Sequence, residues 1–206
     1  SLGLSSFSLM RSETIICAGV FQTTGDWRET KETVIRENMF QRTHKSTSNV
    51  AVNEAIKRLK NGAEWELSYL TETEDGRDTG FLCLLLVSRQ YPLLLDITID
   101  LLHYKIQGGD FSLEPYEINA WYTKLADTHK EIEEMKSSSY KRLCRNTKLI
   151  LQEGGLLVKK GEELFRINKP YISPVLMAGY ERKGTRNDFR MMLKTEEEID
   201  AIMEKR

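Results

Sequence analysis

The chain has 206 residues, of which 40% are hydrophobic and 30% are charged, with a formal net charge of −1 at pH 7. These proportions are ordinary for a soluble globular protein, and the length fits one large domain or two small ones that share a core. The near-zero net charge excludes an overall basic balance, so any affinity for nucleic acid must come from a local surface.

Helical patterns dominate the first half of the chain. A first helix is predicted over about 12–21, and Asp26 and Glu29 have the spacing of a capping box that starts a second. A polar loop over 42–49 leads into a third helix. Its apolar residues recur at i, i+3, i+4 and i+7, namely Val52, Ala55, Ile56 and Leu59.

The segment 81–102 approaches the ~20 apolar residues that a membrane-spanning helix needs. Arg89, Asp96 and Asp100 interrupt it, and a charge at the bilayer centre costs roughly 2.5–3.5 kcal/mol on insertion scales. The pattern instead favours two buried core helices joined near Pro92. We therefore expect no membrane span.

The residues after Gly108-Gly109 are predicted to form a second unit. Pro115 suits the first turn of a helix, and a short acidic helix follows, with capping-box spacing between Thr128 and Glu131. We expect three parts: a helical N-terminal domain over 1–109, a winged-helix-like domain over 110–180, and a C-terminal tail over 181–206 that can be helical.

A basic helix over 137–153, capped by serines and ended by Gly154-Gly155, leads directly into a hairpin. The predicted arms are 156–158 and 164–167, the only strands that the sequence predicts. The turn between them consists of Lys159, Lys160, Gly161 and Glu162. A helix followed at once by a basic hairpin is typical of a winged helix-turn-helix. The predicted fold class is mainly α: a multi-helix bundle followed by a winged helix-turn-helix with a small β-hairpin.

Charge is segregated along the second half. The segment 136–170 holds nine Lys and Arg against three Glu, a net charge of +6, whereas 110–135 holds two Lys against seven acids, a net charge of −5. This distribution fits a molecule with one face that attracts polyanions. Solvated helix faces of opposite sign explain the charges equally well.

The basic helix and the hairpin supply the first set of candidate nucleic-acid contacts. Lys and Arg side chains would take phosphates, serines would add hydroxyl and N–H donors, and Arg142, Arg145 or Asn146 would reach base edges. The predicted contacts are Ser138, Ser139, Lys141, Arg142, Arg145, Asn146 and Lys148 on the helix and Lys159, Lys160 and Arg166 on the wing. The alternative is a solvated helix beside an ordinary charged turn.

A second candidate patch is the polar loop before the third helix. It consists of Arg42, Thr43, His44, Lys45, Ser46, Ser48 and Asn49. Its hydroxyls and N–H groups could hold a phosphate at a helix N-terminus. Ordinary N-capping by Ser46 or Ser48 explains the same residues equally well.

The sequence shows little sign of a catalytic site. The three histidines are scattered, no cysteine pair has zinc-site spacing, and neither Gly-Gly pair has the flanking residues of a phosphate-binding loop. A nuclease would need to gather Glu29, Lys31 and the acids of 72–78 around Mg²⁺. We expect no enzyme, metal, cofactor or small-molecule substrate.

The cysteines and the first residues of the sequence indicate the cellular compartment of the protein. Cys17, Cys83 and Cys144 are odd in number and far apart, as is usual for free thiols in a reducing cytosol. No basic-then-apolar leader precedes the first predicted helix. We therefore expect no secretion signal and a cytoplasmic location.

Three stretches carry a family resemblance: ETIICAGVFQTTGDWRETKETVIRENMFQRTHKSTSNVAVNEAIKRL, SSSYKRLCRNTKLILQEGGLL and RINKPYISPVL. In order and spacing they resemble the BrxA family of bacterial BREX phage-defence systems, over nearly everything from Ser12 to Tyr180. The resemblance implies a compact, mostly helical DNA-binding protein whose N-terminal bundle is similar to NusB, an RNA-binding antitermination factor. It also implies partnership with other BREX components.

The predicted function is therefore non-catalytic binding of double-stranded DNA, mainly through phosphates, by an accessory component of a BREX system. Two alternatives remain open. A protein-interaction subunit would use the basic face to dock an acidic partner, and an RNA-binding protein would use the bundle that is similar to NusB.

Overall fold

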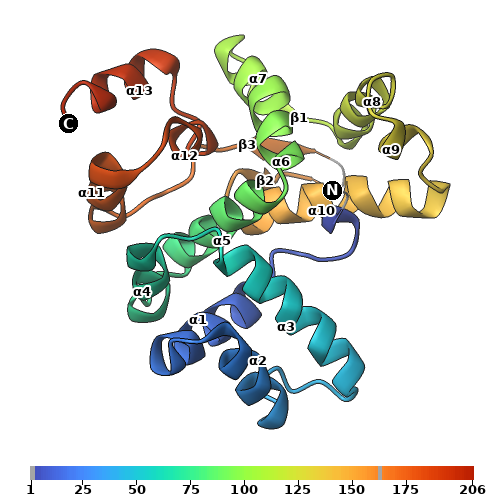
Figure 1. Ribbon diagram of the computed structural model, residues 1–206. Coiled ribbons are helices and arrows are strands. Elements are labelled where there is room, and N and C mark those ends of the chain that lie inside the picture. Colours follow the sequence, from blue (N-terminus) through green and yellow to red (C-terminus); the bar gives the residue numbers. More distant parts are fainter. Residues whose placement is uncertain (1–2, 162–163) are drawn as a thin grey trace.

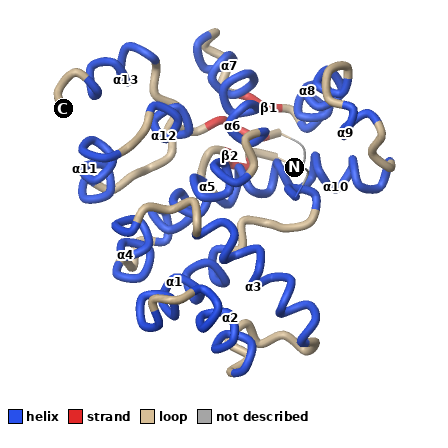
Figure 2. The backbone as a smooth tube through the Cα atoms, in the orientation of Figure 1, coloured by secondary structure: helices blue, strands red, loops and turns tan. Residues whose placement is uncertain are grey.

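The structure is a computed structural model that describes residues 3–161 and 164–206. It is mostly helical, with one small antiparallel sheet, as the sequence predicts (Figures 1 and 2). The elements are η1 (Gly3–Ser5), α1 (Arg11–Thr24), α2 (Trp27–Arg36), α3 (Lys45–Leu59), α4 (Glu64–Glu72), α5 (Gly76–Gln90), α6 (Leu93–Ile97), η2 (Thr98–His103), α7 (Tyr104–Gln107), β1 (Ser112–Leu113), α8 (Pro115–Ala126), α9 (Lys130–Glu133), α10 (Ser137–Glu153), β2 (Leu157–Lys159), β3 (Phe165–Ile167), α11 (Pro174–Lys183), α12 (Arg186–Met191) and α13 (Glu196–Met203).

The first three long helices pack on one another and form the lower part of the molecule in Figure 1. The predicted start of α2 is confirmed, because Asp26 Oδ1 accepts hydrogen bonds from the backbone N–H groups of Arg28 and Glu29, at 2.9 and 2.8 Å. The full capping box is wrong. The Asp26 N–H donates to Thr24 Oγ1 at 3.4 Å instead of to Glu29.

Helix α5 is the centre of the fold, and the remaining elements surround it (Figure 1). Every residue from Asp78 to Ser88 is buried, which accounts for the nearly continuous apolar run. The Asp75 carboxylate caps the helix by accepting from Arg77 N–H at 2.8 Å, so α5 starts at Gly76. One buried cluster includes residues from Leu4 to Ile199, and the predicted domain boundaries stay a prediction.

A bend near Pro92 separates α5 from the next helical run, as predicted. In the described part of the chain, no single helix is long and apolar enough to cross a membrane. Residues 76–90 and 93–107 reach the required length and hydropathy only when the two helical runs are taken together. The axes of these two runs are bent by 115° at the break between them. The second run is continuous but contains the π-helical turn η2, which the sequence pattern did not indicate.

The sheet has the strand order β1-β3-β2, and both pairs are antiparallel. Its hairpin is the predicted one, with Leu157 opposite Ile167 and Val158 opposite Arg166. The expectation of only two strands is wrong, because Ser112 and Leu113 add β1 against β3. The sheet buries Leu113, Leu157, Phe165 and Ile167 on one face.

The C-terminal segment folds as helices α11 to α13 and is joined to the core by a buried ionic network. Arg89 on α5 donates to both carboxylate oxygens of Glu66, each at 2.7 Å, and to Asp188 at 2.8 and 3.2 Å. The Tyr180 hydroxyl donates to Glu66 at 2.5 Å. The network therefore joins α4, α5, α11 and α12.

Burial controls the reactivity of the cysteines. It raises the pKa of the Cys17 and Cys83 thiols to about 12 and raises that of the half-buried Cys144 to a smaller extent. Because the thiolate is the nucleophile, we expect a thiol reagent at pH 8 to modify Cys144 slowly and the other two only after unfolding. Ellman titration with and without guanidinium checks this, and rapid reaction of three native thiols would contradict it.

Candidate nucleic-acid interface

The two sides of α10 differ in burial as the helical period predicts. Leu143, Thr147, Ile150 and Leu151 are buried, and Tyr140 is half-buried. The outward side carries what we call the basic stripe: Lys141, Arg142, Arg145 and Lys148. The first three are exposed, and Lys148 is half-buried.

The cations of the basic stripe are free of acidic partners. Within the described residues none of the four makes an ion pair, and Arg142 donates only to Ser139 Oγ, at 3.2 Å. Residues three and four apart lie on one helix face. The stripe is therefore a continuous row of charges available to an anion.

The start of α10 differs from the prediction of a serine cap. Its N-cap is Lys136, and none of the described side chains caps the first turn. Ser138 is exposed and Ser139 is half-buried. The side chain of Ser138 is therefore at the surface beside the basic stripe, whereas the Ser139 N–H donates to the Lys136 carbonyl at 2.9 Å.

Asn146 is a correction to the predicted contact set. Its side chain is buried, and Nδ2 donates to the backbone carbonyl of Leu4 at 3.1 Å. The Asn146 side chain links η1 to α10 and does not face solvent. It therefore cannot reach a base edge in this structure.

The hairpin follows α10 directly and packs on it. Lys148 Nζ lies 5.3 Å from the centre of the Phe165 ring, which packs the stripe against β3. Lys159, Lys160 and Arg166 are exposed, and Arg166 lies opposite Val158 on the open face of the sheet. The fourth predicted turn residue, Glu162, lies outside the described residues.

The second patch surrounds the start of α3. His44 is the N-cap, and the helix begins at Lys45, so the loop is shorter than predicted. Neither Ser46 nor Ser48 caps it, which makes that alternative wrong. Thr43, His44, Lys45, Ser46 and Asn49 are exposed. A hollow of about 540 Å³ beside them is lined in part by Arg42, Ser46 and Thr47.

Two members of this patch are less available than predicted. Ser48 is buried among the core side chains of α3, so we remove it from the proposed contacts. Arg42 is half-buried and pairs with Glu13 at 2.8 Å, so a phosphate would compete with that carboxylate. The second patch is therefore weaker than the basic stripe.

The N-terminal segment connects the two regions, and the sequence did not reveal it. In Figure 1 the starts of α3 and α10 lie toward the same side, and η1 packs on α10. The fully buried Arg58 donates to the carbonyls of Ser8 and Leu9 at 3.0 and 2.8 Å and pairs with Glu54 at 2.7 Å. The i,i+4 spacing of Glu54 and Arg58 inside an apolar pattern was the available signal.

Two of the acids that a nuclease would need serve structural roles. Asp78 is buried and accepts from Tyr69 Oη at 2.5 Å and from Ser173 N–H at 2.9 Å, while Asp75 caps α5. Nowhere in residues 3–161 and 164–206 do three His, Cys, Asp or Glu residues form a group that could hold a metal ion.

Comparisons with known proteins give a family and a fold. The sequence matches the BrxA family over residues 1–184. None of the curated proteins matches it. The crystal structure of an uncharacterized protein from Magnetospirillum magneticum is similar, with a TM-score of 0.77 and 15% identity, over 94% of this chain and 98% of that chain. At this identity the similarity shows a shared fold.

Proposed function

Because this chain belongs to the BrxA family, and thereby to the proteins associated with BREX phage defence, we propose that it is a non-catalytic accessory protein that binds double-stranded DNA. The observation that supports this most strongly is the basic stripe of α10 together with the hairpin cations. Lys141, Arg142, Arg145, Lys159, Lys160 and Arg166 are all exposed.

In the proposed mode, α10 lies along the major groove and the hairpin acts as a wing on the flanking backbone. Arg side chains suit phosphate because the guanidinium can donate two parallel hydrogen bonds. The buried position of Asn146 leaves Arg142 and Arg145 as the residues available to base edges. Affinity then comes mainly from phosphates, with weak sequence preference.

Competition between duplex DNA and structured RNA of equal length tests the choice of nucleic acid. The deep, narrow major groove of A-form RNA does not admit a helix. We expect DNA to displace a labelled duplex at a lower concentration than RNA. Equal or better displacement by RNA would contradict the proposal.

The acids next to α10 give a further prediction. Glu133 and Glu134 are exposed and precede the start of α10 by a few residues, so their charges oppose an approaching phosphate. We expect Glu133→Gln with Glu134→Gln to tighten duplex binding by roughly two- to fivefold at low salt, and by less at high salt because of screening. Fluorescence anisotropy measures this, and weaker binding would contradict it.

A further inference from the structure

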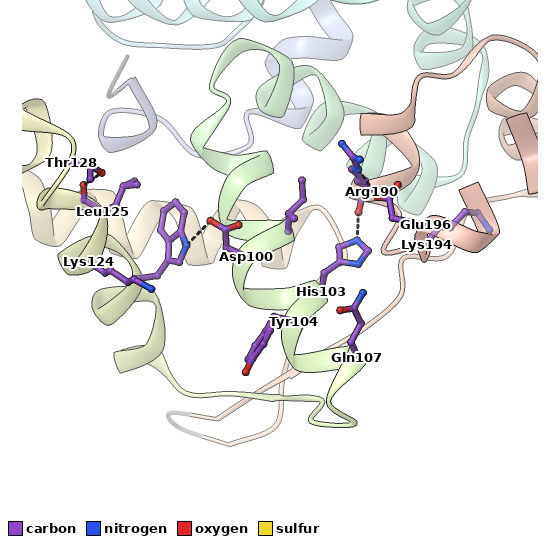
Figure 3. Close-up of a pocket in the computed structure, with 12 residues that line it drawn as sticks. Asp100, His103, Tyr104, Gln107, Lys124, Leu125, Thr128, Arg190, Lys194 and Glu196 are labelled. Carbon is purple, nitrogen blue, oxygen red and sulfur yellow. Dashed lines mark hydrogen bonds and ion pairs between the residues drawn. The ribbon is translucent and has the colours of Figure 1, made fainter. Parts of the chain in front are cut away.

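An open groove of about 970 Å³, lined by no residue of the basic stripe, lies between α8 and the segment from Arg190 to Glu196 (Figure 3). Its floor is η2 and α7, which present Asp100, His103 and Tyr104. Trp121 and Lys124 come from α8 on one side, and Arg190 and Lys194 come from the other. No function described above uses this groove.

The groove has an aromatic and apolar character that solvent-facing surfaces seldom show. Tyr104 is 74% exposed, the largest value among the exposed large hydrophobic residues of the described chain. Lys105 Nζ joins α7 to α8 through an ion pair with Glu117 at 2.5 Å. The half-buried Trp121, with Ile99 and Leu125, adds apolar lining. Exposed aromatic and apolar side chains that lie together typically mark interaction surfaces.

Two lysines and one carboxylate in the groove make no ion pair among the described residues. Asp100 accepts a hydrogen bond from Trp121 Nε1 at 3.3 Å. Glu196 pairs with Arg190 at 2.7 Å and with Arg186 at 3.3 Å, so its charge is satisfied internally. Lys124 and Lys194, on opposite sides, have no ion pair with any residue that the structure describes.

We propose that this groove binds an acidic amphipathic helix of a protein partner. Apolar side chains of that helix would pack on Tyr104 and Trp121, and its carboxylates would pair with Lys124 and Lys194. Helices that bind grooves do so through apolar residues at i, i+4 and i+7. Unpaired lysines on both sides supply charge complementarity for carboxylates on the flanks.

The surroundings of the groove favour a peptide over a nucleic acid. The segment 110–135, which includes α8, has a net charge of −5, from two Lys and seven acids. A nucleic acid carries a charge at every nucleotide and would be repelled along its length. A peptide can place single carboxylates at the two lysines and leave the rest neutral.

Two features of the floor and wall fit a recognition site. The floor contains the π-helical turn η2, and such turns occur frequently at functional sites. Arg190, Lys194 and Glu196 lie beyond residue 184, where the family match ends. One wall therefore comes from the part of the chain outside that match.

Two fluorescein-labelled helical peptides with the same Leu, Trp and Leu positions test the proposal. One carries Glu and the other Lys at the flanking positions, and anisotropy measures the binding of each. We expect the Glu peptide to bind wild-type protein at least about tenfold more tightly than the Lys peptide. The double variant Lys124→Glu with Lys194→Glu should reverse that order.

The proposal would be overturned if the Glu peptide did not bind the wild type more tightly than the Lys peptide. It would also be overturned if the Lys124→Glu, Lys194→Glu variant did not reverse this preference. Displacement of the bound Glu peptide by an equal concentration of single-stranded oligo-dT would do the same, since it would make the ligand a nucleic acid. Duplex DNA binding by the double variant should weaken by less than about tenfold at moderate salt, where long-range charge effects are screened. A larger loss would make the groove part of the duplex interface and overturn the proposal while leaving the proposed function standing.

Discussion

Reversing the charge of Arg142 and Arg145 together should abolish duplex binding while leaving the protein folded. Each exposed guanidinium is expected to make a charge-assisted hydrogen bond to phosphate or base, worth about 1.5–3 kcal/mol. The Arg142→Glu, Arg145→Glu variant should therefore lose at least about 100-fold in affinity at moderate salt. Fluorescence anisotropy with a labelled duplex measures the loss.

The matched control reverses two charges elsewhere. Arg182 and Lys183 are exposed on α11, which lies away from α10 in Figure 1, so Arg182→Glu with Lys183→Glu makes the same change in net charge. The control should lose far less affinity than the α10 variant. The melting temperature of the α10 variant should stay close to that of the wild type, because its two arginines make no ion pair among the described residues. Equal losses in both variants would contradict a specific role for α10.

The second large effect concerns stability. Replacing Arg89 by Met would leave the Glu66 and Asp188 carboxylates, 2% and 4% exposed, without their cation. Removing one partner from a buried ion pair costs about 3–5 kcal/mol. We expect Arg89→Met to lower the free energy of unfolding by that amount in a urea titration.

The matched control for stability is Arg28→Met. Arg28 pairs with Glu32 at 3.0 Å, but the side chains are 88% and 61% exposed, so the change should stay within about 0.5 kcal/mol. An Arg89→Met variant that unfolds within about 1 kcal/mol of the wild type would contradict the assigned role of the network.

The pH dependence of the same variant follows from Glu66. Burial alone would raise its pKa, but the hydrogen bonds and charge of Arg89 outweigh burial and hold the pKa below its ordinary value. Its stabilising contribution is therefore present above the unfolded pKa of about 4.3 and is lost as the pH falls through the folded value. Without Arg89, burial dominates and protonation relieves the unpaired charge. The difference in stability between variant and wild type should shrink as the pH falls from 7 toward 4.

Local signals predicted the helices well. Asp26 before α2 and Pro115 at the start of α8 act on their own first turns, so neighbouring residues suffice to place them. The burial pattern of α10 followed from the period of its apolar residues. The capping box predicted at Thr128 was wrong, because His129 is the N-cap of α9 and Thr128 Oγ1 bonds to the His129 ring instead.

Features that depend on distant residues were not predictable from local patterns. Strand β1 has two residues and exists only through pairing with β3, more than fifty positions later. Asn146 has the polarity of a surface residue, yet its partner is the carbonyl of Leu4. The groove of Figure 3 likewise joins helices from three separate parts of the chain.

The central claim is that α10 and the hairpin form a phosphate-binding surface, and a salt series tests it most directly. Anisotropy of a labelled duplex should show log K falling linearly with log salt concentration. The slope approaches about −5 if all six exposed cations neutralise phosphates, because each contributes about −0.9. Absence of binding at low salt, or binding that does not change with salt, would contradict the claim.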